Sequence, residues 1–593
     1  MDDELRDRVA REAEKHALFN ALKHGSAARV GAIMGPLMGE NPDFRPHGDE
    51  IPEIAAPVIE RANELSPAAQ RERLAELDPA AIEELEAEDE EPDHQLPDLP
   101  DAEDYDEIRM RVAPNPNGPW HLGHARMPAV IGTYKDRYEG SFVCRFDDTD
   151  PETKRPDLDA YDQILEDIAY LGFEPDEVLR ASDRVVTYYD HGRELIEAGG
   201  AYTCSCEAEA FSALKNDAEP CEHRGKDRET VREEFEAMVA GEYDPGEMVL
   251  RVKTDIEHKN PALRDWVGFR MIDTPHPRPE AAEYRCWPML DFQSAVDDQL
   301  TGVTHIIRGI DLQDSAKRQR FLYEYFDWSY PEVIHWGHVQ VEDYDVKMST
   351  SRIKELIDDG ILEGWDDPRA PTIMSVRRRG IRGQALVDAM VDLGTSTSNV
   401  DLSMSTVYAN NRDLVDDETD RRFLVRESIE PRGEAGEKGA RSDNEAAFET
   451  VELPVSGGPD VAEPPVHPDH EDRGTREIPV GDAVLLEADD LPPAGERVWL
   501  KGFGCVRRDG DGLVYTEDDI EVVREGSVDV VQWVPAADNV RVRMRTMDGD
   551  VLGRAEPGLA DYESDDLVQF VRVGFARIDD VSDEETVTYF AHP

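Results

Sequence analysis

The chain has 593 residues, too many for one hydrophobic core, and about four domains is the natural expectation. Its 132 acidic and 65 basic residues give a formal net charge of -67, which ordinarily argues against a nucleic-acid partner because phosphate binding needs clustered positive charge. No apolar run approaches the roughly twenty residues that span a bilayer, and no apolar signal segment follows the acidic N-terminus, so we exclude a membrane protein and expect a cytoplasmic one.

The negative charge is spread over the whole chain, including the segments that carry its motifs. A surface of this kind repels itself in dilute salt and suits molar salt, where the Debye length is only about 3 Å. We therefore interpret the charge as a halophilic adaptation and not as a binding surface. Equal stability of the purified protein in low and in molar KCl would contradict that interpretation. Six cysteines in a chain of this length do not form a disulfide framework.

The N-terminal part is expected to be helical. Residues 1–80 are rich in Ala, Glu, Leu and Arg and carry no recognisable chemistry, which predicts a helical appendage. Residues 81–105 are acidic and contain several prolines, a composition typical of a solvated linker.

An α/β domain is predicted to begin near residue 106, with its first half over 106–183. Strand-like segments over 108–113 and 141–146, and helical spacing over 161–171, favour a parallel, Rossmann-type sheet. Ligands of such sheets bind at the carboxyl ends of the strands. The sequence therefore predicts a ligand site at the ends of these two strands.

The first strand leads into the segment PNPNGPWHLGHAR, residues 114–126. A strand, a tight Gly/Pro turn and a helix start together present backbone N–H groups to phosphate. His121 and His124 can both point at a ligand held there, and Gly123 allows an adenine ring or a phosphate to approach closely. Taken alone, the pattern also fits a turn with two solvated histidines.

Residues 184–283 have a mixed pattern that is typical of an insertion. Within it, Cys204 and Cys206 precede Cys221 and His223 by about fourteen residues. Two such pairs can close a tetrahedral zinc site. They can also be reduced cysteines beside an unrelated histidine, and the sequence leaves both interpretations open.

The α/β pattern resumes over 284–345, where THIIRG (304–309) is expected to be a buried strand that ends in a loop. The segment VKMSTS (346–351) is basic and rich in hydroxyl groups, as are loops that clamp the phosphates of a nucleotide. Helical segments are predicted up to residue 410. From 411 to 593 short strands alternate with Gly and Asp-Gly turns, and two antiparallel β-barrels fit this length.

Together these segments resemble a known enzyme family. HLGH and KMSTS resemble the two signatures of class I aminoacyl-tRNA synthetases, and PNPNGPWHLGHAR with RFDDTD (145–150) resembles their glutamyl/glutaminyl branch. GWDDPRAPT (364–372) is close to a stretch shared by glutaminyl and archaeal glutamyl enzymes, and VVQWVP (530–535) resembles the barrels that bind the anticodon in glutaminyl-type enzymes. The chain is thus similar to the archaeal, haloarchaeal-like type of glutamyl-tRNA synthetase.

This resemblance implies an ATP-dependent, AMP-forming glutamate–tRNA ligase that uses Mg²⁺ and attaches L-glutamate to tRNA(Glu). It also implies that 184–283 meets the acceptor end of the tRNA, with a structural Zn²⁺ in some members, that 346–410 contacts the stem, and that the two barrels bind the anticodon. We expect a monomer. The sequence leaves open whether tRNA(Gln) is a second substrate.

The resemblance also implies roles for single residues. His121, His124 and Lys347 would be catalytic, and Pro114, Gly123, Ser349, Thr350 and Ser351 would complete the ATP site. Thr350 stands where the family signature has its second lysine, so one cation is absent or supplied elsewhere. Lys347 and Lys354 are the candidates that the sequence offers.

The amino-acid pocket follows from charge and resemblance together. Glutamate carries one ammonium and two carboxylates, so its pocket needs one acid and two bases. The resemblance supplies Asp147 for the ammonium and Arg111 and Arg308 for the carboxylates. Glutaminyl enzymes have an uncharged residue at the position of Arg308, and the arginine therefore favours glutamate.

Three other functions fit parts of the pattern. They are a glutamine–tRNA ligase, a small-molecule nucleotidylyltransferase that also uses an HxGH segment, and a catalytically inactive tRNA-binding paralogue. The two C-terminal barrels argue against the second, and intact His121, His124 and Lys347 argue against the third.

Overall fold

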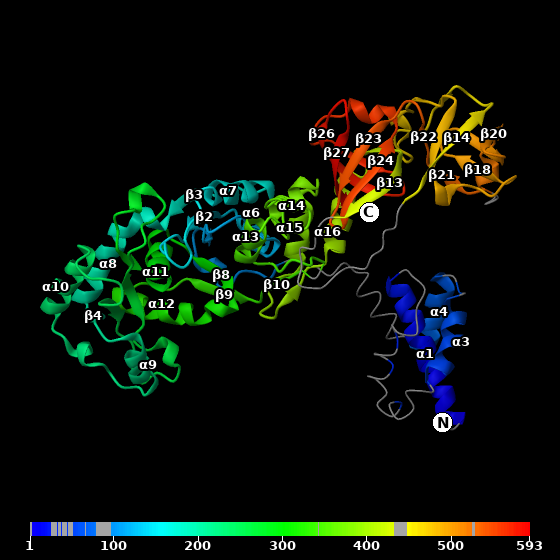
Figure 1. The fold of residues 1–593 in the computed structure, drawn as a ribbon. Coiled ribbons are helices and arrows are strands. Elements are labelled where there is room, and N and C mark those ends of the chain that lie inside the picture. Colours follow the sequence, from blue (N-terminus) through cyan, green and yellow to red (C-terminus); the bar gives the residue numbers. More distant parts are fainter. Residues whose placement is uncertain are drawn as a thin grey trace. The chain divides into compact units, whose positions relative to one another are not determined.

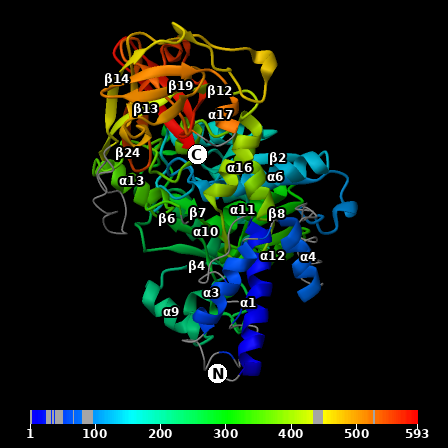
Figure 2. The same cartoon turned by 90° about the vertical axis from the view of Figure 1, so that its right-hand side faces the viewer.

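The computed structural model describes residues 3–24, 33, 37, 44, 51–63, 65, 67–78, 96–341, 343–431, 448–524 and 528–593. The chain divides into two compact units, residues 1–95 and 96–593. The first unit contains helices α1 (Asp3–His24), α3 (Ile51–Asn63) and α4 (Pro67–Leu77). Figure 1 and Figure 2 show α1 beside α3, and apolar residues such as Ala17 and Ile59 are buried between these helices. Residues 79–95, most of the predicted linker, lie outside the described residues.

The second unit begins inside the predicted linker. Leu96 and Leu99 are each 3% exposed and belong to the same hydrophobic core as strand β1. The Leu99 N–H donates to Tyr138 Oη at 2.9 Å, and Tyr134 Oη donates to the Pro97 carbonyl at 2.7 Å. Residues 96–105 are therefore anchored to the α/β domain by Leu96 and Leu99, while most of the other side chains of this segment are exposed, as expected for an acidic linker.

A parallel sheet forms the centre of the second unit. β1 (Arg109–Val112), β2 (Ser141–Phe146) and β3 (Glu177–Arg180) pair in parallel, as do β8 (His305–Gly309) and β9 (Glu332–Trp336). The Thr304 N–H donates to the Arg109 carbonyl at 2.8 Å, which joins the two groups of strands. All six residues of β2 are buried, as expected for a strand covered on both faces. The prediction of a parallel sheet is confirmed.

The helices of this domain connect its strands. α6 (Arg126–Arg137) follows β1, and α7 (Ala160–Tyr170) follows β2, so each serves as the crossover that parallel strands require. Tyr134 of α6 and Ile164 of α7 are fully buried in the same core.

Between β3 and β8 the chain forms a separate antiparallel sheet. Its four strands lie in the order β4-β5-β6-β7, and its own hydrophobic core includes Tyr202, Phe235 and Phe269. The strands are β4 (Ala201–Cys204), β5 (Val249–Val252), β6 (Val267–Met271) and β7 (Cys286–Pro288). The helices around them are α8 (Val185–Glu197), α9 (Ala208–Asn216), α10 (Arg228–Val239), α11 (Leu290–Leu300) and α12 (Gln313–Phe326).

A mainly helical segment follows the parallel sheet. Its elements are β10 (Val339–Gln340), α13 (Thr350–Asp358), α14 (Ile373–Arg378), α15 (Gly383–Asp392), β11 (Val400–Asp401) and α16 (Met404–Val415). Arg378 and Arg379 attach the next domain to it. Arg378 forms an ion pair with Asp579 at 3.0 Å, and Arg379 Nε donates to the Phe590 carbonyl at 3.0 Å.

The C-terminal part, yellow to red in Figure 1, consists of two seven-stranded sheets. The first has the order β12-β25-β26-β27-β23-β24-β13, and its edge strands β12 (Asp420–Arg422) and β13 (Leu424–Pro431) are separated in the chain by Phe423 alone. The second has the order β21-β18-β19-β20-β14-β17-β22, and its edge strands β21 (Val530–Val531) and β22 (Val534–Pro535) are also close neighbours in the chain. Each sheet therefore curls until its two edges meet.

The remaining strands of the two sheets are β14 (Thr450–Ser456), β17 (Ala483–Glu487), β18 (Arg497–Leu500), β19 (Gly504–Asp509), β20 (Gly512–Glu517), β23 (Val540–Arg545), β24 (Gly549–Ala555), β25 (Leu567–Phe570), β26 (Gly574–Val581) and β27 (Thr586–His592). Smaller elements are β15 (Val461–Ala462), β16 (Ile478–Pro479) and α17 (Glu521–Arg524).

Most pairs are antiparallel, but β12 with β25, β23 with β27, β14 with β20 and β18 with β21 are parallel. The sequence predicted antiparallel pairing throughout, and this prediction is wrong for these four strand pairs. Strands that long connections bring together can pair in either direction.

Candidate active site

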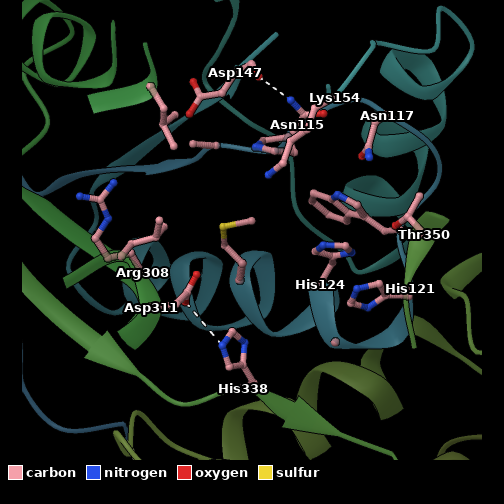
Figure 3. A pocket seen from close by; sticks show the side chains of 18 of the residues that line it. Asn115, Asn117, His121, His124, Asp147, Lys154, Arg308, Asp311, His338 and Thr350 are labelled. Carbon is pink, nitrogen blue, oxygen red and sulfur yellow. Dashed lines mark hydrogen bonds and ion pairs between the residues drawn. The ribbon is translucent and has the colours of Figure 1, made fainter. Parts of the chain in front are cut away.

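A cavity of about 720 Å³ opens at the carboxyl ends of three parallel strands. Ala113 follows β1, Asp147 follows β2, and Gly309 ends β8, and all three line the cavity. Figure 3 shows side chains from these strand ends facing one space. The ligand site therefore lies where the parallel-sheet rule places it.

One wall is the turn that carries the two histidines. A short 3₁₀ turn, Leu122–Ala125, connects the PNPNG segment to α6. The segment GWDDPRAPT supports it from behind, since the Leu122 N–H donates to the Pro371 carbonyl at 2.9 Å and the Ile373 N–H donates to the Trp120 carbonyl at 3.2 Å. The turn is thereby held rigidly against the helical segment.

The rings of His121 and His124 stack with their centroids 3.8 Å apart and their planes inclined by 27°. Burial lowers the pKa of His121 to about 4, and burial together with the neighbouring His121 lowers the pKa of His124 well below its usual range. Both imidazoles are therefore neutral near pH 7. Both Nδ1 atoms are buried without a hydrogen-bond partner among the described residues, so each ring keeps an unused nitrogen.

The VKMSTS loop forms the adjoining wall. Met348, Ser349, Thr350 and Ser351 line the same cavity as His121 and His124. A side chain at Gly118, where φ is +155°, would lie 2.7 Å from Thr350 Cγ2, and one at Gly123 would lie 3.1 Å from Met348 Cε. The two glycines allow the loop to pack directly against the histidine turn, although the two segments are about two hundred residues apart in the chain.

Lys347 occupies a different position from these neighbours. Its side chain is exposed, and it is not among the residues that line the cavity. Lys354, the other lysine of this segment, forms an ion pair with Asp157 at 3.7 Å and does not line the cavity either.

Arg111, Asp147 and Arg308 all line the cavity, as a common amino-acid pocket requires. Arg111 Nε donates to Asp298 Oδ1 at 3.1 Å, and Arg308 Nη1 donates to Gln319 Oε1 at 2.9 Å. Figure 3 shows Arg308 at the opposite end of the cavity from His121.

Asp147 has a partner that the sequence did not suggest. Arg145 Nε donates to Asp147 Oδ1 at 2.7 Å, and Arg145 Nη1 donates to Asp298 Oδ1 at 2.6 Å. Gln293 Nε2 donates to the same oxygen of Asp147 at 2.9 Å, whereas the closest donor to Oδ2 lies at 3.4 Å. One oxygen of Asp147 is thus held in place and the other has capacity for a further donor.

Several lining residues were not singled out from the sequence: Asn115, Asn117, Lys154, Arg270, Asp311, Trp336 and His338. Asn115 and Asn117 lie in the PNPNG segment, and Lys154 closely follows the RFDDTD run. Their places in the chain could therefore have indicated that they line the cavity. His338 Nε2 lies 3.5 Å from Asp311 Oδ1 (Figure 3), a contact that depends on how β8 and β9 end and has no sequence signal.

The four residues of the possible zinc site lie together in the insertion. Their ligand atoms are all within 4.8 Å of one another. Cys204 Sγ lies 3.9 Å from Cys221 Sγ, and His223 Nδ1 lies 3.8 Å from Cys204 Sγ and 3.3 Å from Cys206 Sγ. All six cysteines of the chain are free.

Among the described residues, no helix has the length and apolar character needed to cross a membrane.

Comparison with known proteins identifies relatives over the whole chain. Family models described as tRNA synthetases class I (E and Q) match residues 107–417 as the catalytic domain and residues 446–523 and 530–579 as anti-codon binding domains. The chain is 71% identical over 594 residues to the glutamate--tRNA ligase of Halobacterium salinarum, with 100% of both chains covered. It is 69% identical over 593 residues to that of Natronomonas pharaonis and 67% identical over 596 residues to that of Haloarcula marismortui, again with 100% of both chains covered.

Proposed function

Because this chain belongs to the class I tRNA synthetases of the glutamate and glutamine (E and Q) group, we infer that it ligates glutamate to tRNA at the expense of ATP. The full-length relatives from haloarchaea carry this activity in their names. The structural observation that supports this inference best is one cavity lined by both the histidine turn and the VKMSTS loop.

The first step forms glutamyl-adenylate. A carboxylate oxygen of glutamate attacks the α-phosphorus of ATP, the bond from that phosphorus to the bridging oxygen breaks, and pyrophosphate leaves. The nucleophile is already a carboxylate, so no general base is required. The protein's task is to position the reactants and to stabilise the charge that develops on the phosphoryl oxygens.

We assign His121 and His124 to this stabilisation. Their rings are neutral and both residues line the cavity, so each can donate one hydrogen bond to a phosphate oxygen from a ring N–H that faces it. The cavity around the histidines is also lined by the other residues proposed for the ATP site, Pro114, Gly123, Ser349, Thr350 and Ser351. Lys347, the proposed catalytic lysine, does not line it. Mg²⁺ would neutralise part of the triphosphate charge when it accompanies ATP.

Lys347 can take part only after a change of its position. Its exposed side chain would have to turn toward the cavity, together with the loop that carries it. Loop closure on substrate binding is a common way to complete an active site.

Glutamate would lie between Arg111, Asp147 and Arg308. The substrate ammonium would bind Asp147 Oδ2, which accepts only a long hydrogen bond from Arg145 at 3.4 Å, and the two arginines would bind the carboxylates. A guanidinium at position 308 discriminates against glutamine, whose neutral amide offers no charge to compensate it.

The second step transfers glutamate to tRNA. A ribose hydroxyl of the 3′-terminal nucleotide attacks the carbonyl carbon of the adenylate, loses its proton, and AMP leaves. We propose that residues 106–183 and 284–345 form the catalytic domain, that 184–283 receives the acceptor end, and that 346–410 contacts the stem.

The two β domains (411–593) would bind the anticodon of tRNA(Glu). They form a cavity of about 350 Å³ that is lined by Arg421, Lys501, Gln569 and Arg572. Arg421 and Arg572 are paired with Asp416 and Asp490, so Lys501 is the cation with the freest charge here, and the amide of Gln569 can read the edge of a base. Aminoacylation of tRNA(Gln) with glutamate tests whether its anticodon is bound as well.

We propose a structural Zn²⁺ bound by Cys204, Cys206, Cys221 and His223. Ligand atoms at about 2.0–2.3 Å from a tetrahedral centre lie about 3.5–3.8 Å apart, close to the separations of these atoms. The Cys221 thiol also contacts Tyr202 Oη at 3.7 Å, and Ser205 Oγ contacts His223 Nε2 at 3.1 Å, so outer partners orient the ligands. The ion would stiffen the insertion and would not take part in the chemistry.

The experiment that tests the function is ATP–pyrophosphate exchange with glutamate or glutamine, with and without tRNA. Exchange with glutamate that requires tRNA supports the inference, as expected for this branch of the family. Exchange with glutamine would indicate a glutamine–tRNA ligase, and activity without either amino acid would indicate a nucleotidylyltransferase. No exchange under any condition would indicate an inactive paralogue.

A further inference from the structure

The positive charge of the nucleotide cavity is not supplied by its most obvious residues. His121 and His124 are neutral near pH 7, because burial lowers their pKa values. Lys347 does not line the cavity, and Lys354 is held by Asp157. A triphosphate carries several negative charges and position 350 carries no lysine, so the cavity needs a cation from another segment even when Lys347 turns toward it.

The arginines that line the cavity already have partners. Arg126 donates to the carbonyls of Gly337 at 2.9 Å and of Gly394 at 2.6 Å, and it lies 4.7 Å above the Trp336 ring. Arg270 forms ion pairs with Asp150 at 3.0 Å and with Glu152 at 3.8 Å.

The two remaining arginines belong to the amino-acid end. Arg111 is bound to Asp298, and Arg308 is bound to Gln319. Each of the four arginines is therefore already hydrogen-bonded within the protein, Arg111 and Arg270 to carboxylates and Arg126 and Arg308 to neutral groups.

Lys154 differs from all of these cations. Its side chain is exposed and lines the cavity, and the structure gives it no hydrogen bond or ion pair with any residue that it describes. Figure 3 shows Lys154 at the same end of the cavity as Asn115 and Asn117, away from Asp311 and His338. An ammonium on a flexible stem is well suited to a phosphate because it needs no fixed geometry.

The loop that carries Lys154 is fixed at both of its ends. Asp150 Oδ1 accepts the Thr153 N–H at 2.9 Å, and Arg155 Nη1 donates to the Pro275 carbonyl at 2.9 Å. The Asp157 N–H donates to the Pro116 carbonyl at 2.7 Å.

The same loop therefore contacts both segments that line the nucleotide end. Asp157 binds the PNPNG turn through its backbone and Lys354 of α13 through its carboxylate. The loop of Lys154 is thus attached both to the PNPNG segment and to α13, the helix that continues the VKMSTS loop.

We propose that Lys154 binds the triphosphate of ATP and supplies the cation that position 350 does not carry. Thr350 cannot be that cation, and its methyl group packs against Gly118 in a buried position. This inference rests on the proposed ATP-dependent activation of glutamate. It makes Lys154 a substrate-binding residue of the first step, on a segment outside both signatures.

The test compares Lys154→Gln with Lys154→Arg in tRNA-dependent ATP–pyrophosphate exchange. Lys154→Gln should lower kcat/KM for ATP about 10- to 100-fold, the size expected for one group that stabilises developing charge, and should weaken inhibition by pyrophosphate. Lys154→Arg should keep most of the activity, because it keeps the charge. The KM for glutamate should change less than about threefold, since the charge lies away from Arg308.

Two further variants make the result decisive. Lys135→Gln, at the end of α6 and bound to Asp176 at 3.0 Å, serves as the matched control and should leave exchange unchanged. The proposal would be overturned if Lys154→Gln kept kcat/KM for ATP within twofold of the parent value. It would also be overturned if the variant changed only the KM for glutamate. A large loss in Lys354→Gln with none in Lys154→Gln would transfer the role to Lys354. In each of these cases the parent enzyme would still show exchange, so the proposed function would stand.

Discussion

Replacement of Asp298 by asparagine should destabilise the protein much more than the loss of a surface ion pair. Asp298 Oδ1 accepts hydrogen bonds from Arg111 Nε at 3.1 Å and from Arg145 Nη1 at 2.6 Å, and its side chain is 1% exposed. Burial raises the pKa of Asp298, but Arg145 and Arg111 outweigh it, and the pKa lies below its usual value. Asparagine keeps the volume and removes the charge that two buried guanidiniums share.

The magnitude follows from that geometry. Breaking a buried ion pair by removing one partner costs about 3–5 kcal/mol, because the other charge stays buried without compensation. For a domain of about 150–250 residues, 1 kcal/mol corresponds to roughly 2–4 °C, so the Tm should fall by at least about 6 °C. The KM for glutamate should also rise, since Asp298 orients Arg111 and, through Arg145, Asp147.

The assay is thermal unfolding in molar KCl, where exposed ion pairs are screened and buried ones are not. Asp273→Asn is the matched control, because the Asp273 side chain is 57% exposed and is also paired with an arginine, Arg285. Its effect should be below about 1 kcal/mol. Equal Tm shifts in the two variants, or an unchanged KM for glutamate in Asp298→Asn, would refute the reasoning.

Three further predictions concern specificity, metal and pH. Arg308→Gln should reduce glutamate activation and raise the relative activity with glutamine in pyrophosphate exchange; an unchanged preference would remove Arg308 from the pocket. The purified protein should contain one zinc per chain by elemental analysis, and Cys206→Ser should lower that content and the Tm; a metal-free protein of equal stability would contradict the site. Burial lowers the pKa of His121 from 6.5 to about 4, so the unfolded chain takes up this proton first and stability should fall as the pH drops from 6.5 toward 4. This group accounts for at most about 3.4 kcal/mol of that loss, and in urea titrations His121→Asn should lose less stability than the parent over the same interval.

Local structure near the cavity was predictable from the sequence. The strand expected over 141–146 is β2 (Ser141–Phe146), in which Phe142, Val143, Cys144 and Phe146 supply the apolar residues that a strand buried on both faces requires. The helix expected over 161–171 is α7 (Ala160–Tyr170), whose apolar residues repeat with helical spacing. The strand expected over 108–113 is shorter, Arg109–Val112, since strand ends depend on pairing with neighbours.

Long-range closure was not predictable in this way. The run VVQWVP divides into β21 and β22 around Gln532 and Trp533, because it forms both edges of one curled sheet. The buried core includes Trp533, which periodicity alone would place in a strand. Strand direction in the mixed sheets likewise depends on long connections.

The same distinction applies to the site. His121 and Arg308 were found because they lie in recognisable segments. No sequence pattern indicates that Arg145 pairs with Asp298, which lies on the other side of the insertion. No pattern indicates either that Lys347 stays outside the cavity, since this depends on the conformation of its loop. A motif identifies the type of chemistry, whereas the tertiary structure decides which of its side chains reach the cavity.

The most direct test of this account is adenylate formation in His124→Asn, measured as glutamate-dependent exchange in the presence of tRNA. The account holds that the histidine turn and the VKMSTS loop form one nucleotide site, since His124 and Thr350 line the same cavity. We predict a loss of about 100-fold or more in kcat/KM for ATP, with a Tm close to that of the parent protein. A folded His124→Asn variant that forms adenylate at the parental rate would contradict it.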